Sequence, residues 1–399
     1  MNPSLNNRET SVALTILLGI LIALSALGTD LYVPALPGIA DAFDAPVSAA
    51  QLTLTTYFLG IAAGQLLWGP LSDRFGRRPV LLAALATMLA VAIVAPFLQS
   101  IGTLAAARLV QGLGMAGGVV AARSVVRDLH AHEQAARVLS RMMVVFSVVP
   151  IAAPIAGAAI VARGGWPAIF WAYAAIATVL LAAVALGLRE TAPAARGSIH
   201  PLDIARTLGT ILSERRFVAP FLVFLCAQVA ILAWVTNSAF ALVRGLGVPL
   251  AAYGWMFAAV MLGQIVGAWT SSRLVMRMGS PRLLGVGGRL MFAGGLAAAA
   301  LAWGGSNLAW QSVVAPFCIV LLGASIIVPS ATALALSPFP HAAGAASSLI
   351  GAIGFTVAAV ISTALAAAFD GTARPMASVA ALAGAGAIIM ERLRRRGAA

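Results

Sequence analysis

LGTDLYVPALP, residues 27–37, is the stretch of this sequence from which the fold can be argued. It ends an apolar run of about 25 residues, which is long enough to cross a bilayer and too long for the apolar core of a signal peptide. Asp30 lies within that run, where a charged group costs at least ~2.5–3.5 kcal/mol on insertion scales, so it predicts a functional site. Pro34 and Pro37 each remove a helical hydrogen bond and predict a bend at the end of this first spanning helix.

The composition predicts a polytopic α-helical membrane protein. Of the 399 residues, 61% are hydrophobic and only 9% are charged, whereas about 25% of residues are charged in soluble proteins. Runs of roughly 20 apolar residues, the length that spans a bilayer, recur twelve times. These runs lie at 12–37, 48–68, 80–98, 102–126, 138–162, 168–188, 217–240, 251–273, 283–303, 309–335, 343–368 and 376–391.

The longest polar stretch separates the sixth run from the seventh. We therefore expect an N-terminal six-helix bundle over residues 1–188, a cytoplasmic loop over 189–216 and a C-terminal six-helix bundle over 217–399. The fold class is an all-α membrane protein with 12 transmembrane helices in two pseudo-symmetric bundles.

The arginines predict the orientation in the membrane. All 25 basic residues are arginines, and 19 of them fall on one side if the loops alternate, against Arg163, Arg244 and Arg374 on the other. Because cytoplasmic loops carry the positive excess, both termini are expected in the cytoplasm. The net charge of +13 is then explained by topology, and we expect a lipid bilayer and no nucleic acid as a partner.

The two halves of the sequence also repeat one another. Gly60, Gly64 and Gly76 in the first half recur as Gly263, Gly267 and Gly279 in the second, at an offset of 203 residues. Duplicated six-helix units are typical of transporters, which place their substrate site where the repeats meet. The alternative is a chance alignment of small residues in a glycine-rich chain.

The loop GPLSDRFGRRPV at 69–80 resembles the signature of the major facilitator superfamily between its second and third helices. The matching residues are Gly69, Leu71, Asp73, Arg74, Gly76, Arg77 and Arg78. Leu27-Gly28 followed by Pro34 and Pro37 is similar to the first-helix motif of twelve-helix drug:proton antiporters. TDLYVPALP, with the segment 51–79 that follows it, resembles the Bcr/CflA branch, associated with bicyclomycin and chloramphenicol resistance.

This resemblance implies a multi-pass protein of the bacterial cytoplasmic (inner) membrane. It also implies proton-coupled efflux of small amphipathic drugs by alternating access, with the proton gradient as energy source and no cofactor. We expect a monomer that binds its small-molecule substrate and protons. The alternative is a permease or exporter of this superfamily for a sugar or other metabolite, with different coupling. An enzyme is disfavoured, because no Ser/His, paired-Asp or His-rich group lies at membrane depth. Cys226 and Cys318 lack metal-site spacing, so no metal site is expected.

Asp30 is predicted to couple protons to substrate, since it is the only carboxylate well inside an apolar run. Arg108 lies in RLVQGLG, which resembles the superfamily's fourth-helix motif and so implies a role in proton transfer, with Gln111 one turn away. At 1.5 Å per residue, Asp30 and Arg108 lie about 10 Å below the same surface, so they are expected to pair. The alternatives are a structural Asp30 bound to the backbone that Pro34 breaks and a structural Arg108.

The signature loop and the fifth helix carry further predictions from the resemblance. Gly69, Asp73, Arg74, Gly76, Arg77 and Arg78 are expected to form a conformational latch, in which Asp73 pairs with arginines and faces the start of the eleventh helix. The alternative is a topology anchor only. Pro150, Pro154 and Gly157 resemble the antiporter motif of the fifth helix, although Ala153 and Ala158 replace its usual glycines.

Four further residues are candidates for the substrate cavity, because mostly apolar pockets with a few polar groups suit drug-like ligands. They are Tyr32, Tyr57, Trp234 and Asn237. The alternative is that these side chains serve in packing or as interfacial anchors.

Overall fold

The computed structural model describes residues 12–129, 132–192, 209–304, 309–339 and 343–396. Within these ranges the chain is helical and contains no strand, and twelve helical segments are long and apolar enough to cross a membrane. The twelve predicted spans are therefore confirmed in number. The central stretch 193–208 lies outside the described residues.

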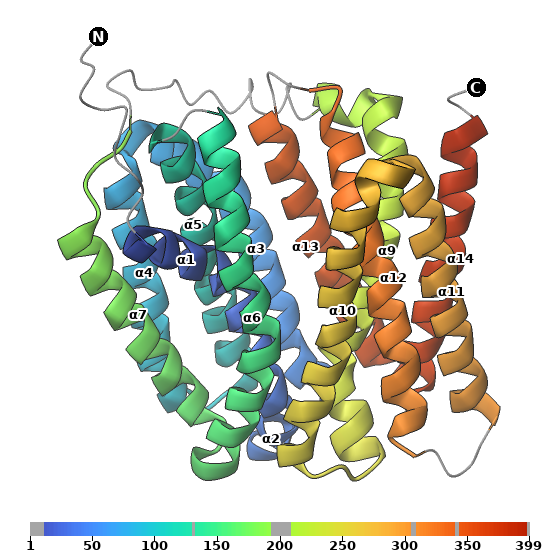
Figure 1. Cartoon of the computed structure of the whole chain (residues 1–399). Helices are drawn as coiled ribbons and strands as arrows, with labels where there is room; N and C mark the ends of the chain where they lie inside the picture. Colours follow the sequence, from blue (N-terminus) through green and yellow to red (C-terminus); the bar gives the residue numbers. More distant parts are fainter. Residues whose placement is uncertain (1–11, 130–131, 193–208, 305–308, 340–342, 397–399) are drawn as a thin grey trace.

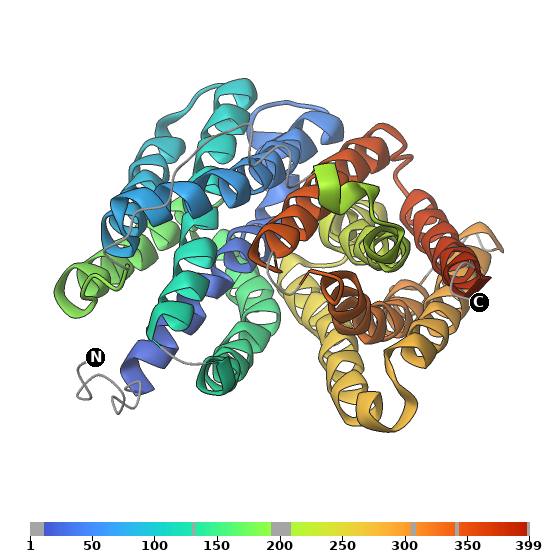
Figure 2. The same cartoon turned by 90° about the horizontal axis from the view of Figure 1, so that it is seen from above.

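The first half contains six spans. They are formed by α1 (Val12–Asp30) with η2 (Val33–Ala35) and α2 (Leu36–Ala42), then by α3 (Val47–Phe75), α4 (Arg77–Val94) with η3 (Ala95–Phe97), α5 (Ile101–Leu129), α6 (His132–Gly164) and α7 (Pro167–Gly187). The second half is formed by α9 (Arg215–Ala239) with the π-helical η4 (Phe240–Gly245), then by α10 (Leu250–Met278), α11 (Ser280–Gly304), α12 (Gln311–Leu336), α13 (Ala343–Ala367) and α14 (Arg374–Arg396). Figures 1 and 2 show the two groups of helices side by side.

The repeated glycines have the same packing role in both halves. A Cβ atom built on Gly60 of α3 would lie 2.0 Å from the Leu109 carbonyl oxygen of α5, and one on Gly263 of α10 would lie 2.4 Å from the Cys318 carbonyl oxygen of α12. Glycine thus lets these helix pairs approach backbone to backbone, which drives helix association in lipid. Gly76 and Gly279, which end α3 and α10, both have positive φ, at 100° and 77°. The internal repeat is therefore structural, and chance alignment does not explain it.

The two halves contact each other along two pairs of helices, α3 with α13 and α6 with α10. At the end of the molecule where α2 and η4 lie (Figure 1), polar contacts also join them. The Arg244 guanidinium in η4 pairs with Asp41 of α2 and donates to the Pro37 carbonyl at 3.3 Å. The described conformation is closed at this end.

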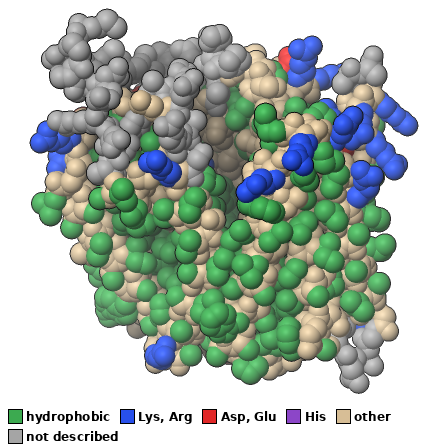
Figure 3. Space-filling view, in the orientation of Figure 1, with side chains coloured by type: hydrophobic (Ala, Val, Ile, Leu, Met, Phe, Trp, Pro, Cys, Tyr) green, Lys and Arg blue, Asp and Glu red, His purple; other side chains and the backbone are tan. Residues whose placement is uncertain are grey.

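Arginine side chains gather at the opposite end, and the band between the two ends is largely hydrophobic (Figure 3). At the arginine-rich end the surface is hollowed where the halves meet. The apolar band fits the hydrocarbon layer of a bilayer, with the charged end in the headgroup region.

Candidate functional site

The first helix ends at Asp30, and the way it ends creates the centre of the site. The Tyr32 N–H bonds the Thr29 carbonyl at 3.0 Å instead of continuing the helical pattern to Gly28. Pro34 has no N–H to donate, so the helical hydrogen-bond series cannot resume there. The Gly28 carbonyl is left without its helical partner, inside the protein, where an unpaired polar group is costly.

Arg108 of α5 supplies the missing partner. Its Nη2 donates to the Gly28 carbonyl at 2.9 Å, and its Nη1 donates to Gln111 Oε1 at 2.6 Å. The guanidinium carbon lies 3.9 Å from the ring centroid of Tyr32 and 4.0 Å from that of Tyr57, so the cation sits against two aromatic faces. Such contacts contribute about 2 kcal/mol when desolvated, and Arg108 is fully buried.

Tyr173 of α7 completes this cluster and was not predicted. Its hydroxyl donates to the Gly28 carbonyl at 3.0 Å, so this oxygen accepts from both Arg108 and Tyr173. The chain has only four tyrosines, and three of them surround Arg108. The rarity of tyrosine in so apolar a chain was the sequence signal that could have found it.

Asp30 itself is only 6% exposed. It has no hydrogen-bond or ion-pair partner among the residues that the structure describes. The expected ion pair with Arg108 is therefore not formed in this conformation, because equal depth does not fix the direction in which each side chain leaves its helix. Asp30 ends α1, and η2, which follows it, contacts α9 and α10 of the second half. Asp30 thus lies near the place where the two halves meet.

Polar side chains join the halves close to this centre. Gln51 of α3 is fully buried, and its Nε2 donates to Asn237 Oδ1 at 2.9 Å and to the Thr236 carbonyl at 3.2 Å, both in α9. Thr55 and Thr363 share a hydrogen bond of 3.3 Å. Gln51 was not predicted, since a glutamine in a spanning helix has no sequence feature that identifies its partner.

The predicted cavity residues are all enclosed in this conformation. Tyr32 and Tyr57 hold Arg108, and Asn237 binds Gln51 across the interface. Trp234 is fully buried inside the second half, with its ring 5.2 Å from Phe317 and 5.9 Å from Phe257. In this conformation aromatic packing within the second half encloses Trp234, as the packing alternative expects, and its place in a substrate cavity stays a prediction.

The fifth-helix motif lies between the site and the second half. A Cβ on Gly157 of α6 would lie 2.4 Å from the Leu31 carbonyl oxygen, next to Asp30. On another face of α6, the Pro154 carbonyl oxygen would lie 3.0 Å from a Cβ on Gly254 of α10. Pro150 is also inside α6. The small residues of this motif therefore permit close contact with both α1 and α10.

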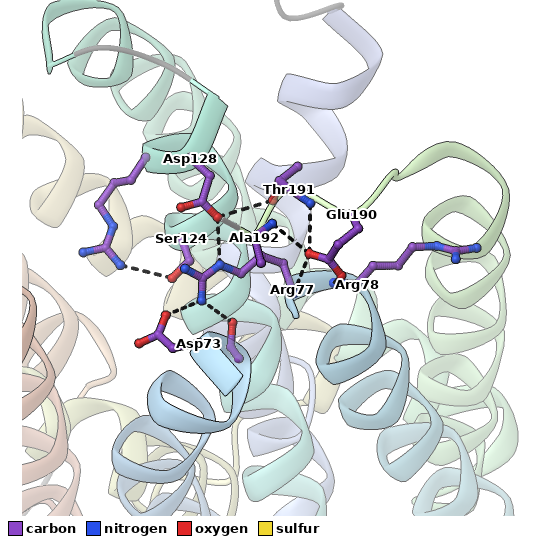
Figure 4. A network of polar contacts seen from close by, with 10 residues as sticks. Asp73, Arg77, Arg78, Ser124, Asp128, Glu190, Thr191 and Ala192 are labelled. Carbon is purple, nitrogen blue, oxygen red and sulfur yellow. Dashed lines mark hydrogen bonds and ion pairs between the residues drawn. The ribbon is translucent and has the colours of Figure 1, made fainter. Parts of the chain in front are cut away.

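Three of the predicted latch residues, Asp73, Arg77 and Arg78, take part in a polar network at the arginine-rich end (Figure 4). Asp73 pairs with Arg77, as expected, and Arg77 Nε also donates to Asp128 of α5 at 2.7 Å. Arg78 donates to the Ala185 carbonyl of α7 at 2.7 Å. Within the described residues, no hydrogen bond or ion pair joins Asp73 to α13, the eleventh span. The expected contact with its start is thus not found for the described residues, in which the network ties together helices of the first half.

Glu190, which was not predicted, anchors the start of α4 in this network (Figure 4). Its carboxylate accepts the backbone N–H groups of Arg77 at 2.8 Å and Arg78 at 3.2 Å. Partial burial acts to raise the pKa of Glu190, but the backbone N–H donors outweigh it and the pKa is lowered. Gly76 adopts φ 100°, and a Cβ there would lie 2.5 Å from this carboxylate.

The remaining two latch residues, Gly69 and Arg74, are less constrained by their surroundings. A Cβ on Gly69 would meet nothing within 4 Å, so close packing does not require glycine there. The Arg74 guanidinium lies 5.4 Å from the Phe75 ring and is exposed.

Fold and site together define a class: a multi-pass membrane protein of two repeated six-helix halves, with an ionisable site where they meet. This is the architecture of secondary transporters. The family model described as Major Facilitator Superfamily matches residues 18–363. The chain belongs to the major facilitator superfamily.

Curated relatives agree with the branch that the motifs resemble. The chain is 30% identical over 370 residues to the "Chloramphenicol resistance protein" of Pseudomonas aeruginosa, covering 89% of this chain and 84% of the relative. It is 29% identical over 373 residues to the "Bicyclomycin resistance protein homolog" of Haemophilus influenzae, covering 93% of each. The "Multidrug resistance protein D" of Escherichia coli is 28% identical, with 87% and 86% covered. The resemblance to the Bcr/CflA branch is thus confirmed.

Solved structures support the fold. A POT family transporter aligns with a TM-score of 0.74 at 12% identity, over 95% of this chain and 94% of that one. A D-xylose-proton symporter aligns with a TM-score of 0.71 at 15% identity, over 97% of each chain. With its twelve candidate spans and bacterial relatives, the chain is a multi-pass transporter of the bacterial inner membrane.

Proposed function

We propose that this protein exports small amphipathic drugs across the cytoplasmic membrane in exchange for protons. The relatives named for resistance to chloramphenicol, bicyclomycin and multiple drugs support efflux of such compounds. The proton gradient, rather than a cofactor, supplies the energy.

The observation that carries the coupling is Asp30, a buried carboxyl group with no bonding partner in the described part of the chain. A carboxylate enclosed in this way is costly unless it takes up a proton. A proton that enters from the outside neutralises Asp30, and its release to the inside restores the charge. Arg108, held by the Gly28 carbonyl and Gln111, keeps a fixed positive charge in the same part of the first half.

Alternating access requires the two halves to separate at one end at a time. The contacts of Gln51 with Asn237 and of Arg244 with Asp41 close the end opposite the arginine-rich surface. We propose that this closed end faces outward and that both termini face the cytoplasm, because arginines concentrate in cytoplasmic loops. One chain supplies residues of both halves to the site, which supports a monomer as the working unit.

The test uses Asp30→Asn, which keeps the size of the side chain and removes its charge. Inside-out vesicles with an acidified lumen receive chloramphenicol or bicyclomycin on their outer, formerly cytoplasmic, face. The wild type is expected to release luminal protons when drug is added, and Asp30→Asn is expected to abolish that release.

Asp44→Asn is the matched control, since it removes one exposed carboxylate at a position with φ 45° that asparagine tolerates. It should behave as the wild type. Full proton-driven export by a folded Asp30→Asn protein would contradict the assignment of Asp30. Drug-stimulated proton entry into the lumen by the wild type would contradict antiport.

A further inference from the structure

A cavity lies at the arginine-rich end of the second half, and neither Asp30 nor Arg108 lines it. It has a volume of about 680 Å³ and is lined by the ends of three helices, α9, α12 and α14. Arg215 begins α9, Pro338 lies two residues after α12, and Arg394 lies two residues before the end of α14. The cavity is therefore at the level where a membrane protein meets the lipid headgroups.

The charge of this cavity is positive. Arg215 and Arg216 are exposed, and their guanidinium groups have no hydrogen-bond or ion-pair partner within the described ranges. Glu214 next to them is engaged at the start of α9, where it accepts the backbone N–H of Arg216 at 3.3 Å. Two free guanidinium groups at the mouth of one cavity attract an anion.

Arg394 contributes a third, fixed guanidinium. Its Nε and Nη2 donate to the two oxygens of Glu391 at 2.6 and 3.0 Å, and Glu391 also accepts from Arg395 at 2.7 Å. Since one buried carboxylate faces two arginines, this group retains a positive charge. Glu391 fixes the position of this guanidinium, and its Nη1, which has no hydrogen-bond partner in the described part of the chain, can donate to a phosphate oxygen.

Below the arginines the lining is apolar. Arg215, Val218, Ala219 and Leu222 follow one face of α9, and Leu393 of α14 lies opposite. From residue 215 to residue 222 the helix descends about 10 Å, from the headgroup layer into the start of the hydrocarbon. Leu222 and Leu393 are 38% and 52% exposed, so the apolar part of the cavity opens toward the lipid side.

We propose that this cavity binds an anionic phospholipid. The phosphate of its headgroup lies against Arg215, Arg216 and Arg394, and its glycerol and upper acyl chain contact the apolar wall of α9 and α14. Basic pockets between spanning helices on the cytoplasmic side are suited to such headgroups. The site does not depend on the proposed drug export, because its lining residues all belong to the second half, outside the Asp30 cluster.

The test measures lipid binding to the purified full chain by native mass spectrometry. Dioleoyl-phosphatidylglycerol is compared with dioleoyl-phosphatidylcholine, which has the same acyl chains and no net charge. The wild type is expected to bind the anionic lipid at least tenfold more tightly. Arg215→Gln with Arg216→Gln should weaken phosphatidylglycerol binding roughly 10- to 30-fold, since each arginine near a membrane surface contributes several-fold in affinity.

Arg282→Gln with Arg392→Gln is the matched control, because it removes two exposed arginines at the same end outside the cavity. It should change the affinity less than threefold. Ala219→Trp fills the apolar part and keeps every charge, so it should also abolish tight binding if the acyl chain enters. Thermal unfolding and elution volume confirm that each variant is folded.

Two competition experiments distinguish a lipid phosphate from a free phosphate anion. Inorganic phosphate and glycerophosphoglycerol, the headgroup without acyl chains, should fail to displace phosphatidylglycerol at millimolar concentration. Displacement by either would overturn a lipid site in favour of a free-anion site. Equal binding of the two lipids, or wild-type binding by the Arg215/Arg216 variant, would overturn the proposal altogether.

Discussion

Gln51 holds the two halves together at the end opposite the arginine-rich surface, and its replacement should open that end. Its side chain makes two buried hydrogen bonds to α9, at 2.9 and 3.2 Å. Each such bond contributes about 1 kcal/mol net, so Gln51→Leu removes roughly 2 kcal/mol from the closed state. When the end opens, water can replace both hydrogen bonds. The substitution therefore destabilises the closed state and leaves the free energy of the open state unchanged.

A difference of ~2 kcal/mol changes the ratio of open to closed molecules about 30-fold. A wild-type open fraction of roughly 3% would thus rise to about half. Nitroxide labels at Ser48→Cys and Ala251→Cys, both exposed at the starts of α3 and α10, report the separation of the halves at this end. The measurement requires replacement of the native Cys226 and Cys318 by serine.

The distance distribution from pulsed electron resonance should gain a long component in Gln51→Leu. Thr178→Val serves as control, because the Thr178 hydroxyl bonds the Ala174 carbonyl within its own helix at 2.8 Å. It should leave the distribution unchanged. An unchanged distribution in folded Gln51→Leu would refute the argument that these bonds hold this end closed.

Three further predictions concern packing, the latch and pH. Gly60→Ala should lower the free energy of unfolding by about 1–3 kcal/mol or prevent folding, whereas Gly69→Ala, with open space around it, should unfold at the wild-type temperature. Asp73→Ala should lower the transport rate more than the substrate affinity; an unchanged rate in a vesicle uptake assay would count against a latch. Because the pKa of Glu190 is lowered, its stabilisation is complete above its unfolded pKa of ~4.3 and is lost as the pH falls through the folded value. Melting temperatures measured from pH 7 to pH 3 should therefore fall at acid pH, and less steeply in Glu190→Gln.

The sequence allowed the architecture to be predicted because membrane insertion depends on composition over long windows. The twelve spans follow from hydropathy, and the repeat of Gly60 and Gly263 follows from spacing. The predicted ends of the helices were less accurate where a proline interrupts the helical hydrogen bonds. The run 12–37 is one apolar segment in the sequence, but the helix ends at Asp30 and continues as η2 and α2 to Ala42.

The site was predictable only in part. Asp30, Arg108 and Gln111 were identified as candidates, and the structure places Arg108 and Gln111 in contact. The main partner of Arg108 is the Gly28 backbone carbonyl, which becomes available only because the helix ends at Asp30. A carbonyl group is common to every residue, so no pattern of side chains identifies it. Tyr173 could have been singled out by the rarity of tyrosine in this chain, but its partner could not, because that partner is the same backbone atom.

The duplicated halves share the glycines that pack their helices together, but they do not share their carboxylate side chains. Gly60 and Gly263 bring equivalent helices into contact, yet the position equivalent to Asp30 is the buried Ala233, and that equivalent to Asp73 is the exposed Met276. Only the first half therefore has a carboxyl group at membrane depth in this part of the repeat. A proton bound at Asp30 can affect the second half only through the interface, where η2, next to Asp30, contacts α9 and α10 and where Gln51 binds Asn237. Substitutions at these interface positions should therefore alter coupling without removing a titrating group. A carboxylate introduced by Ala233→Asp, in contrast, would be placed in a fully buried position.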